Sequence, residues 1–163
     1  MILITYRYNL RKFGELPYHL VRCRQFEDLY VNVLFNYQWL YAKMSACPLQ
    51  AVLSDFEDAC NHVENKDEKR EIILVADSLR LGGAILGQYP DMLAPQLVGR
   101  LLSEMDSNNN IRSLLRQCDE EGLMQNALVP TYHCMHTPGG PLKYSLEGHQ
   151  FAVFVFKLTS DFR

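Results

Sequence analysis

The feature that most constrains the fold is the spacing of apolar residues between Gln25 and Met44, which recur at steps of three and four or side by side. They are Phe26, Leu29, Tyr30, Val33, Leu34, Tyr37, Leu40, Tyr41 and Met44. This spacing is typical of α-helix that buries one face. Asn36 is expected to divide the stretch into two helices, because its short amide side chain competes for backbone hydrogen bonds.

A second apolar stripe begins just after Pro48 and predicts a helix with one buried face. Its members are Leu49, Val52, Leu53, Phe56, Ala59, Cys60 and Val63, opposed by Asp55, Glu57, Asp58 and Asn61. The charged run Asn65–Glu71 that follows predicts a solvated turn and the beginning of another helix. Asp67 and Glu68 would then lie near its positively polarised N-terminus.

Proline and glycine mark the ends of the neighbouring helices. Pro17 suits a first turn, so we predict a short helix over Leu16–Cys23 with Leu20 and Cys23 facing inward. Apolar and small residues at 72, 76, 79, 83 and 86 predict a helix that packs closely over its small positions. The alternative is a break at Gly82 and Gly83, because each glycine costs a helix about 1 kcal/mol against alanine.

Asp91 is a candidate cap for a helix over residues 97–105, with Pro95 delaying its start. Residues 107–110 interrupt that helix, and a shorter one over 111–118 is expected to end at Gly122. Residues 16–122 therefore predict a mainly α fold, an antiparallel array of six or seven helices. The predicted helical core comprises Leu20, Leu29, Val33, Trp39, Leu40, Leu53, Phe56, Leu79, Leu97 and Leu101.

The character of the chain changes after Gly122. Prolines and glycines at 130, 138, 139, 140 and 141 oppose long helices, and residues 151–159, FAVFVFKLT, read as a strand buried on both faces. We therefore predict a short β or irregular C-terminal tail. A strand of this kind needs partners, so further chain is expected after residue 163.

Composition favours a globular, cytoplasmic protein. The chain has 163 residues, 48% hydrophobic and 21% charged, which is enough to bury a core. A net charge of −3 argues against nucleic acid or anionic membrane as a partner. The five cysteines are scattered and odd in number, which favours a reducing compartment. The first residues, MILITYRYNLRKF, hold too short an apolar run for a signal peptide or a membrane span.

Residues 16–59 resemble the helical segment that follows the winged-helix domain in NACHT and WD-repeat proteins, which are related to apoptosome-type signalling ATPases. The matching residues are Leu16, Pro17, His19, Leu20, Phe35, Trp39, Leu40, Ala42, Lys43, Leu53 and Asp55. The segments QLVGRLL, at 96–102, and PGGPL, at 138–142, are also similar to that family.

Residues 146–161 resemble the opening of a WD repeat. The residues that carry this likeness are Gly148, His149, Val153, Ser160 and Asp161. The two resemblances occur in the order found in the family. They imply three parts: the end of a winged-helix region at 1–15, a helical connecting domain at 16–122, and a linker with the first strand or strands of an incomplete propeller at 123–163. His149 would then have a structural, hydrogen-bonding role in the blade.

The chain departs from the family's nucleotide chemistry. That chemistry needs a G-x-x-x-x-G-K-[ST] loop to hold phosphates, and the glycines at 82–87 are not followed by lysine. No Trp-Asp pair closes a WD repeat within the sequence. We therefore expect no bound cofactor, no catalysis, and a fragment of a larger protein.

Three other groups of residues have possible chemistry and also a plainer structural interpretation. His133, Cys134 and His136, with Cys118, offer metal donors at a spacing that fits no strong zinc pattern. Cys60 and His62 are two apart on a helix and point away from each other, which disfavours a nucleophile and base pair. Trp39 and nearby tyrosines would suit base stacking, but their helical spacing favours core packing.

The resemblance implies a non-catalytic helical scaffold that links a nucleotide switch to a WD-repeat sensor in a signalling protein. Its partners would be proteins, including the nucleotide-binding and WD-repeat regions of that larger molecule. The competing hypothesis is a free-standing helical adaptor that binds other proteins through its grooves. An enzyme is the third and most distant alternative.

Overall fold

The computed structural model describes residues 8–124, 127–140 and 142, and every regular element in these residues is helical. The predicted mainly α fold is confirmed, with eight α-helical segments in the described ranges. They are α1 (Leu10–Arg22), α2 (Phe26–Leu29), α3 (Tyr37–Ala46), α4 (Leu49–His62), α5 (Lys66–Leu81), α6 (Gly83–Leu86), α7 (Leu93–Leu101) and α8 (Asn109–Met124).

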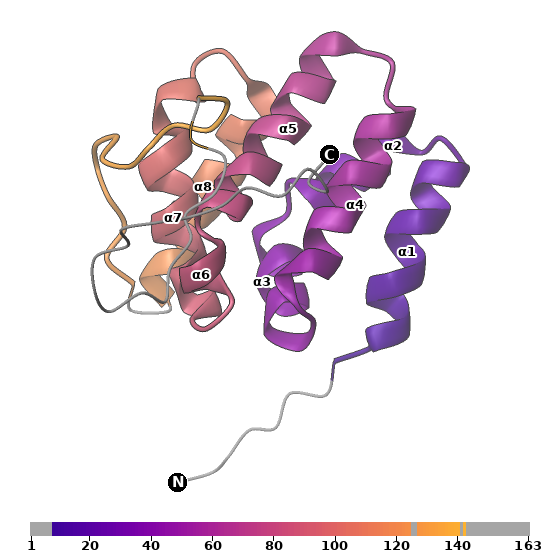
Figure 1. Ribbon diagram of the computed structural model, residues 1–163, viewed down its shortest axis with the longest axis horizontal. Coiled ribbons are helices and arrows are strands. Elements are labelled where there is room, and N and C mark those ends of the chain that lie inside the picture. The colour runs from indigo at the N-terminus through magenta and orange to yellow at the C-terminus, as the bar shows by residue number, and fades with distance from the viewer. Residues whose placement is uncertain (1–7, 125–126, 141, 143–163) are drawn as a thin grey trace, which may run out of the picture.

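The longer helices lie side by side as an array (Figure 1). From right to left in that view stand α1, α4, α5 and α7, and each contacts the next. Helix α3 contacts both α4 and α8, and α8 packs along α7. Three residues join α4 to α5, which makes this pair an antiparallel helical hairpin. One continuous hydrophobic core extends through the array.

Helix α1 begins at Leu10, six residues earlier than predicted. The Asn9 side chain accepts a hydrogen bond of 3.0 Å from the Lys12 amide and so caps the helix. Pro17 is therefore the eighth residue of α1 and not part of its first turn. Cys23 lies just beyond the last helical residue and is exposed, so the prediction that it faces inward was wrong. The domain boundary expected between residues 15 and 16 would fall within α1.

The stretch from Gln25 to Met44 is divided at Asn36, as predicted. The Asn36 side chain accepts from the Trp39 amide at 2.9 Å and caps α3. The preceding stretch was not predicted in detail, because α2 continues into a π-helical turn over Tyr30–Leu34. The Phe35 amide donates to the Tyr30 carbonyl at 3.0 Å, which closes this wider turn.

The helix predicted to continue through the glycines breaks there, so the alternative is confirmed. Helix α5 ends at Leu81, Gly82 is its C-cap, and the short α6 begins at Gly83. The packing at this break is nevertheless close. A Cβ added to Gly82 would lie 3.0 Å from the Gln96 side-chain oxygen.

Asp91 is not a helix cap, contrary to prediction. A 3₁₀ turn over Pro90–Met92 precedes α7, and the Asp91 carboxylate accepts from the Tyr41 hydroxyl at 2.7 Å. Pro95 is the third residue of α7, where an amide N–H has no helical partner in any case. A second 3₁₀ turn, Leu102–Glu104, follows α7 before the break near residue 107.

Helix α8 continues through Gly122, which was predicted to end it. A Cβ at this position would lie 2.8 Å from Cγ2 of Val129 and 3.0 Å from Cβ of Ala94. The glycine is needed for close approach and not for a left-handed turn. At the other end of α8, buried Glu71 accepts from the Asn110 amide at 3.0 Å. The charged run that contains Glu71 is thus only partly solvated.

Each of the ten residues predicted as helical core is at most 9% exposed. Residues 127–140 contain no regular element and contact α7, where the amides of Cys134 and Met135 both donate to the Gly99 carbonyl, at 3.3 and 3.1 Å. The predicted strand at 151–159 lies outside the described residues, as do Gly148, His149, Val153 and Asp161. Those predictions remain predictions.

Candidate interaction groove between α1 and α3

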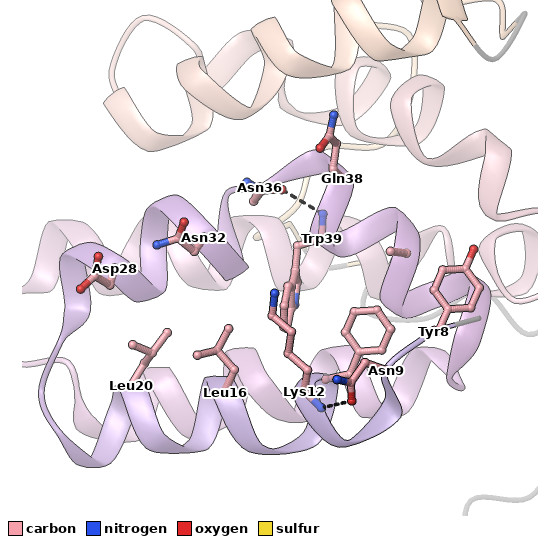
Figure 2. Close-up of a pocket in the computed structure, with 12 residues that line it drawn as sticks. Tyr8, Asn9, Lys12, Leu16, Leu20, Asp28, Asn32, Asn36, Gln38 and Trp39 are labelled. Carbon is pink, nitrogen blue, oxygen red and sulfur yellow. Dashed lines mark hydrogen bonds between the residues drawn. The ribbon is translucent and has the colours of Figure 1, made fainter. Parts of the chain in front are cut away.

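An open groove of about 650 Å³ lies between α1 and the stretch that contains α2, the π turn and α3 (Figure 2). Its volume is in the range of ligand and peptide pockets. Its apolar lining residues are Phe13, Leu16, Leu20, Trp39 and Ala42. Its polar and amphipathic lining residues are Tyr8, Asn9, Lys12, Asp28, Asn32, Asn36 and Gln38.

Trp39 forms one wall of the groove, and its indole N–H has no acceptor among the described residues. Its ring meets the Phe13 ring edge-on, with centroids 5.1 Å apart, and the side chain is largely buried as predicted. The ammonium of Lys12 lies 5.8 Å from the indole centroid, from the α1 side. The indole Nε1 is buried and has no acceptor in the described part of the chain. The indole N–H of a buried tryptophan usually has an acceptor. The Trp39 donor therefore has a hydrogen-bonding capacity that the described residues leave unfilled.

The far rim of the groove is polar and spaced by single helical turns. Asp28, Asn32 and Asn36 are four residues apart, and Figure 2 shows Asp28 and Asn32 across the groove from Leu20 and Leu16. The groove therefore has an apolar side, formed by Leu16 and Leu20 of α1, that faces a polar side. An apolar surface with a few placed polar groups is the usual composition of a binding pocket.

Next to the groove, a buried ion pair joins three helices at what we call the Lys43 junction, formed by Lys43, Asp55 and the Phe13 carbonyl. The Lys43 ammonium donates to the Asp55 carboxylate at 2.6 Å and to the Phe13 carbonyl at 2.8 Å. Pro17 has no N–H, so the Phe13 carbonyl four residues earlier has no partner within α1. The ammonium supplies that missing hydrogen bond.

Both side chains of the Lys43 junction are shielded from water, Lys43 at 3% and Asp55 at 13% exposure. Burial raises the pKa of Asp55 to about 6, against the lowering effect of Lys43. Asp55 was placed opposite the apolar stripe of α4, yet its side chain is largely shielded from water. Lys43 itself follows the buried position of Leu40 by three residues, so its helical phase was the available sign that it points inward.

The other candidate residues do not form a reactive site in the described ranges. His133, Cys134 and His136 are exposed while Cys118 is fully buried. Across those ranges, no three His, Cys, Asp or Glu side chains are arranged to hold a metal ion.

Cys60 and His62 do not pair with each other. Burial raises the pKa of the half-buried Cys60 thiol, which disfavours the nucleophilic thiolate. His62 hydrogen-bonds instead to the Arg22 guanidinium and, through Nδ1 at 2.8 Å, to the Asp58 carbonyl.

In the described ranges, no helix has the length and apolarity needed to cross a membrane.

The known proteins to which the chain is similar all have NACHT and WD-repeat domains in their names. The chain is 32% identical over 145 residues to NACHT and WD repeat domain-containing protein 2 of Homo sapiens, and 33% identical to that of Mus musculus; both matches cover 89% of this chain. It is 29% identical over 151 residues to NACHT domain- and WD repeat-containing protein 1 of Mus musculus, with 86% of this chain covered.

These matches span only 8% to 9% of the relatives' own lengths. No family model and no solved structure matches the chain. The resemblance is therefore confirmed as homology to a small region of NACHT and WD-repeat proteins.

Proposed function

We propose that the chain is a non-catalytic helical connector between a NACHT nucleotide switch and a WD-repeat sensor in a larger cytoplasmic signalling protein. The observation that carries this proposal is homology to a small region of proteins whose names include both domains. A connector must transmit a coupling free energy, roughly 1–3 kcal/mol for typical allosteric pairs. One continuous hydrophobic core from α1 to α8 supports this proposal, because a displacement at one end of a close-packed core is felt by its neighbours.

The groove between α1 and α3 is the contact surface in this proposal, and its occupant is a peptide segment of the NACHT side. Tyr8, at the beginning of the described chain, lines the groove. Any polypeptide that precedes α1 in a larger protein is therefore tethered beside it, which raises its effective concentration there. A backbone carbonyl of that segment would accept from the indole N–H of Trp39, which has no acceptor among the described residues.

The Lys43 junction fastens the groove to the rest of the array. It connects α1, on one side of the groove, to α3 and α4. A displacement of α1 by the bound segment would disrupt hydrogen bonds to a buried ammonium, which are worth more than neutral ones. The position of α1 and the packing of α4 are thereby coupled.

The test is to replace the homologous region of human NACHT and WD repeat domain-containing protein 2 with this chain. The chimera should bind nucleotide and show nucleotide-dependent protection from limited proteolysis. Trp39→Ala in the groove and Phe56→Ala in the core should each weaken that nucleotide dependence while nucleotide binding remains.

A matched control is Tyr132→Ala, because Tyr132 is 79% exposed and lies outside the groove. Full nucleotide-dependent protection in both the Trp39→Ala and the Phe56→Ala chimeras would contradict the proposal.

A free-standing adaptor is the second candidate, and the open groove of the isolated chain favours it. An adaptor would bind a peptide of another protein at the same surface. In that case the chain would not support nucleotide-dependent protection in the chimera, and Trp39→Ala would weaken only peptide binding.

A further inference from the structure

Arg100 is a buried cation that has no carboxylate partner among the described residues. It belongs to α7 and is 9% exposed. Nη1 donates to the His136 carbonyl at 3.1 Å and Nη2 to the Gln96 side-chain oxygen at 3.0 Å. Both acceptors are neutral. The remaining nitrogen, Nε, is buried and has no acceptor in the described part of the chain.

The other described arginines show that a buried guanidinium without a nearby carboxylate is unusual in this chain. Six of the eight described arginines have a carboxylate oxygen within 4.0 Å, namely Arg11, Arg22, Arg24, Arg70, Arg80 and Arg112. The two exceptions are exposed Arg116 and buried Arg100. Burial of a cation without a counter-charge is costly, and burial lowers the pKa of Arg100 accordingly.

Arg100 lines a second open pocket of about 650 Å³, and the other lining residues are His133–Thr137. This segment is held against α7, because the Gly99 carbonyl accepts from two of its amides. Gly99 is also close to the Met135 side chain, since an added Cβ would lie 3.1 Å from the Met135 sulfur. The segment therefore packs against α7 beside Arg100, while the side chains of His133, His136 and Thr137 are exposed.

We propose that Arg100 and the segment His133–Thr137 form a binding site for an oxyanion, a phosphate or a carboxylate group. A guanidinium has five N–H donors, and Arg100 uses two of them. Its planar fork matches two oxygens of such a group. The imidazoles of His133 and His136 and the Thr137 hydroxyl supply further hydrogen-bonding groups around the same pocket.

Phosphate and carboxylate share this chemistry, and two arms of one experiment distinguish them. The full chain is titrated with sodium phosphate or with sodium acetate, each against sodium chloride at equal ionic strength. The Arg100 side-chain Nε–H and the Cys134 and Met135 amides are followed by ¹H–¹⁵N NMR. We expect saturable shifts at these groups with at least one anion, and the stronger binder identifies the source.

Substitution assigns the effect to the guanidinium. Arg100→Gln should weaken anion binding about ten- to a hundredfold, since hydrogen bonds to charged groups contribute roughly 1.5–3 kcal/mol. Arg100→Lys should retain part of the binding, because it keeps the charge and loses the fork. The matched control is Arg112→Gln, because Arg112 bonds to the Asp106 carbonyl and lies outside the pocket.

The titration of the unaltered chain keeps the inference testable even if Arg100→Gln does not fold. Shifts with phosphate and acetate no larger than those with chloride would overturn it. So would equal anion affinity of the folded Arg100→Gln and Arg112→Gln variants. The inference does not depend on the connecting role proposed above.

Discussion

The α1–α4 region and the α7–α8 region bury their interiors in different ways. The aromatic ring pairs of the described chain all fall between residues 8 and 41. The Lys43 junction joins α1, α3 and α4 and so also belongs to the α1–α4 region. In contrast, all nine residues of α7 are buried, and the described hydrophobic side chains that α8 buries are Ile111, Leu114, Leu115 and Cys118. Each region nevertheless has an open pocket of about 650 Å³ and one buried donor without an acceptor among the described residues, Nε1 of Trp39 and Nε of Arg100. The two regions therefore differ in the side chains that fill their cores and not in whether they are open.

The largest effect is expected from Lys43→Met, which removes the buried cation from the α1–α4 region. The substitution leaves the Asp55 carboxylate and the Phe13 carbonyl without their partner. Loss of one member of a buried ion pair costs roughly 3–5 kcal/mol. Urea denaturation followed by circular dichroism should show this fall in the free energy of unfolding.

The double variant Lys43→Met with Asp55→Leu is the control for that measurement. It removes both charges, and apolar replacement of a buried pair is often close to neutral. The double variant should therefore recover much of the lost stability. If it is as unstable as Lys43→Met alone, the ion pair does not account for the effect.

Two glycine substitutions compare the regions directly. Gly122→Ala introduces a Cβ 2.8 Å from Val129, so we expect a loss of about 1–3 kcal/mol, as for an overpacked core. Gly14 lies within α1 and has nothing within 4 Å of an added Cβ. Gly14→Ala should therefore stabilise by about 0.5–1 kcal/mol. Thermal unfolding of both variants measures the contrast, and effects of the same sign would remove it.

Stability should depend on pH through Asp55. The pKa of Asp55 is raised to about 6 in the folded chain, above its unfolded value of 3.8, so the folded state binds more protons between these two values. Its protonation therefore adds stability as pH falls. From pH 7 to pH 5 this contribution is about 1 kcal/mol.

Asp55→Asn is the control for the pH experiment. Urea denaturation at pH 7 and pH 5 should show a gain on acidification that is about 1 kcal/mol larger in the unaltered chain than in the variant. Equal changes in the two proteins would mean that Asp55 does not titrate in this window.

The smallest effect on stability is expected from Lys12→Ala in the groove. An exposed cation above an aromatic ring contributes about 0.5–1 kcal/mol at most, and Lys12 is exposed. The substitution should change Trp39 fluorescence and increase its quenching by acrylamide. The free energy of unfolding should fall by no more than the amount given above. Unchanged quenching would show that Lys12 does not shield the indole.

Local periodicity was sufficient to predict most of the helices. The stripe from Leu49 to Val63 became α4, Leu49–His62, and Asn36 caps a helix where a break was expected. These features depend on neighbouring residues alone, through the spacing of apolar side chains and the competition of a short amide.

The incorrect predictions concern positions whose structure depends on residues that are distant in the sequence. Gly122 resembles a helix end in sequence, but Val129 and Ala94 require its small size. Pro17 is tolerated inside α1 because Lys43, 26 positions later, satisfies the freed carbonyl. The pairing of Lys43 with Asp55 and the burial of Arg100 likewise depend on tertiary neighbours that one sequence does not identify.

The π-helical turn at Tyr30–Leu34 makes the shape of the groove sensitive to chain length. Deletion of one residue here would allow an ordinary α-helical turn, and everything before it would rotate by about 100° relative to α3, one residue's share of a 3.6-residue turn. Asp28 would then leave the rim of the groove, and α1 would lose its alignment with Lys43. A homologue that lacks one residue at this position is therefore expected to have a different cleft, even if every lining side chain is the same.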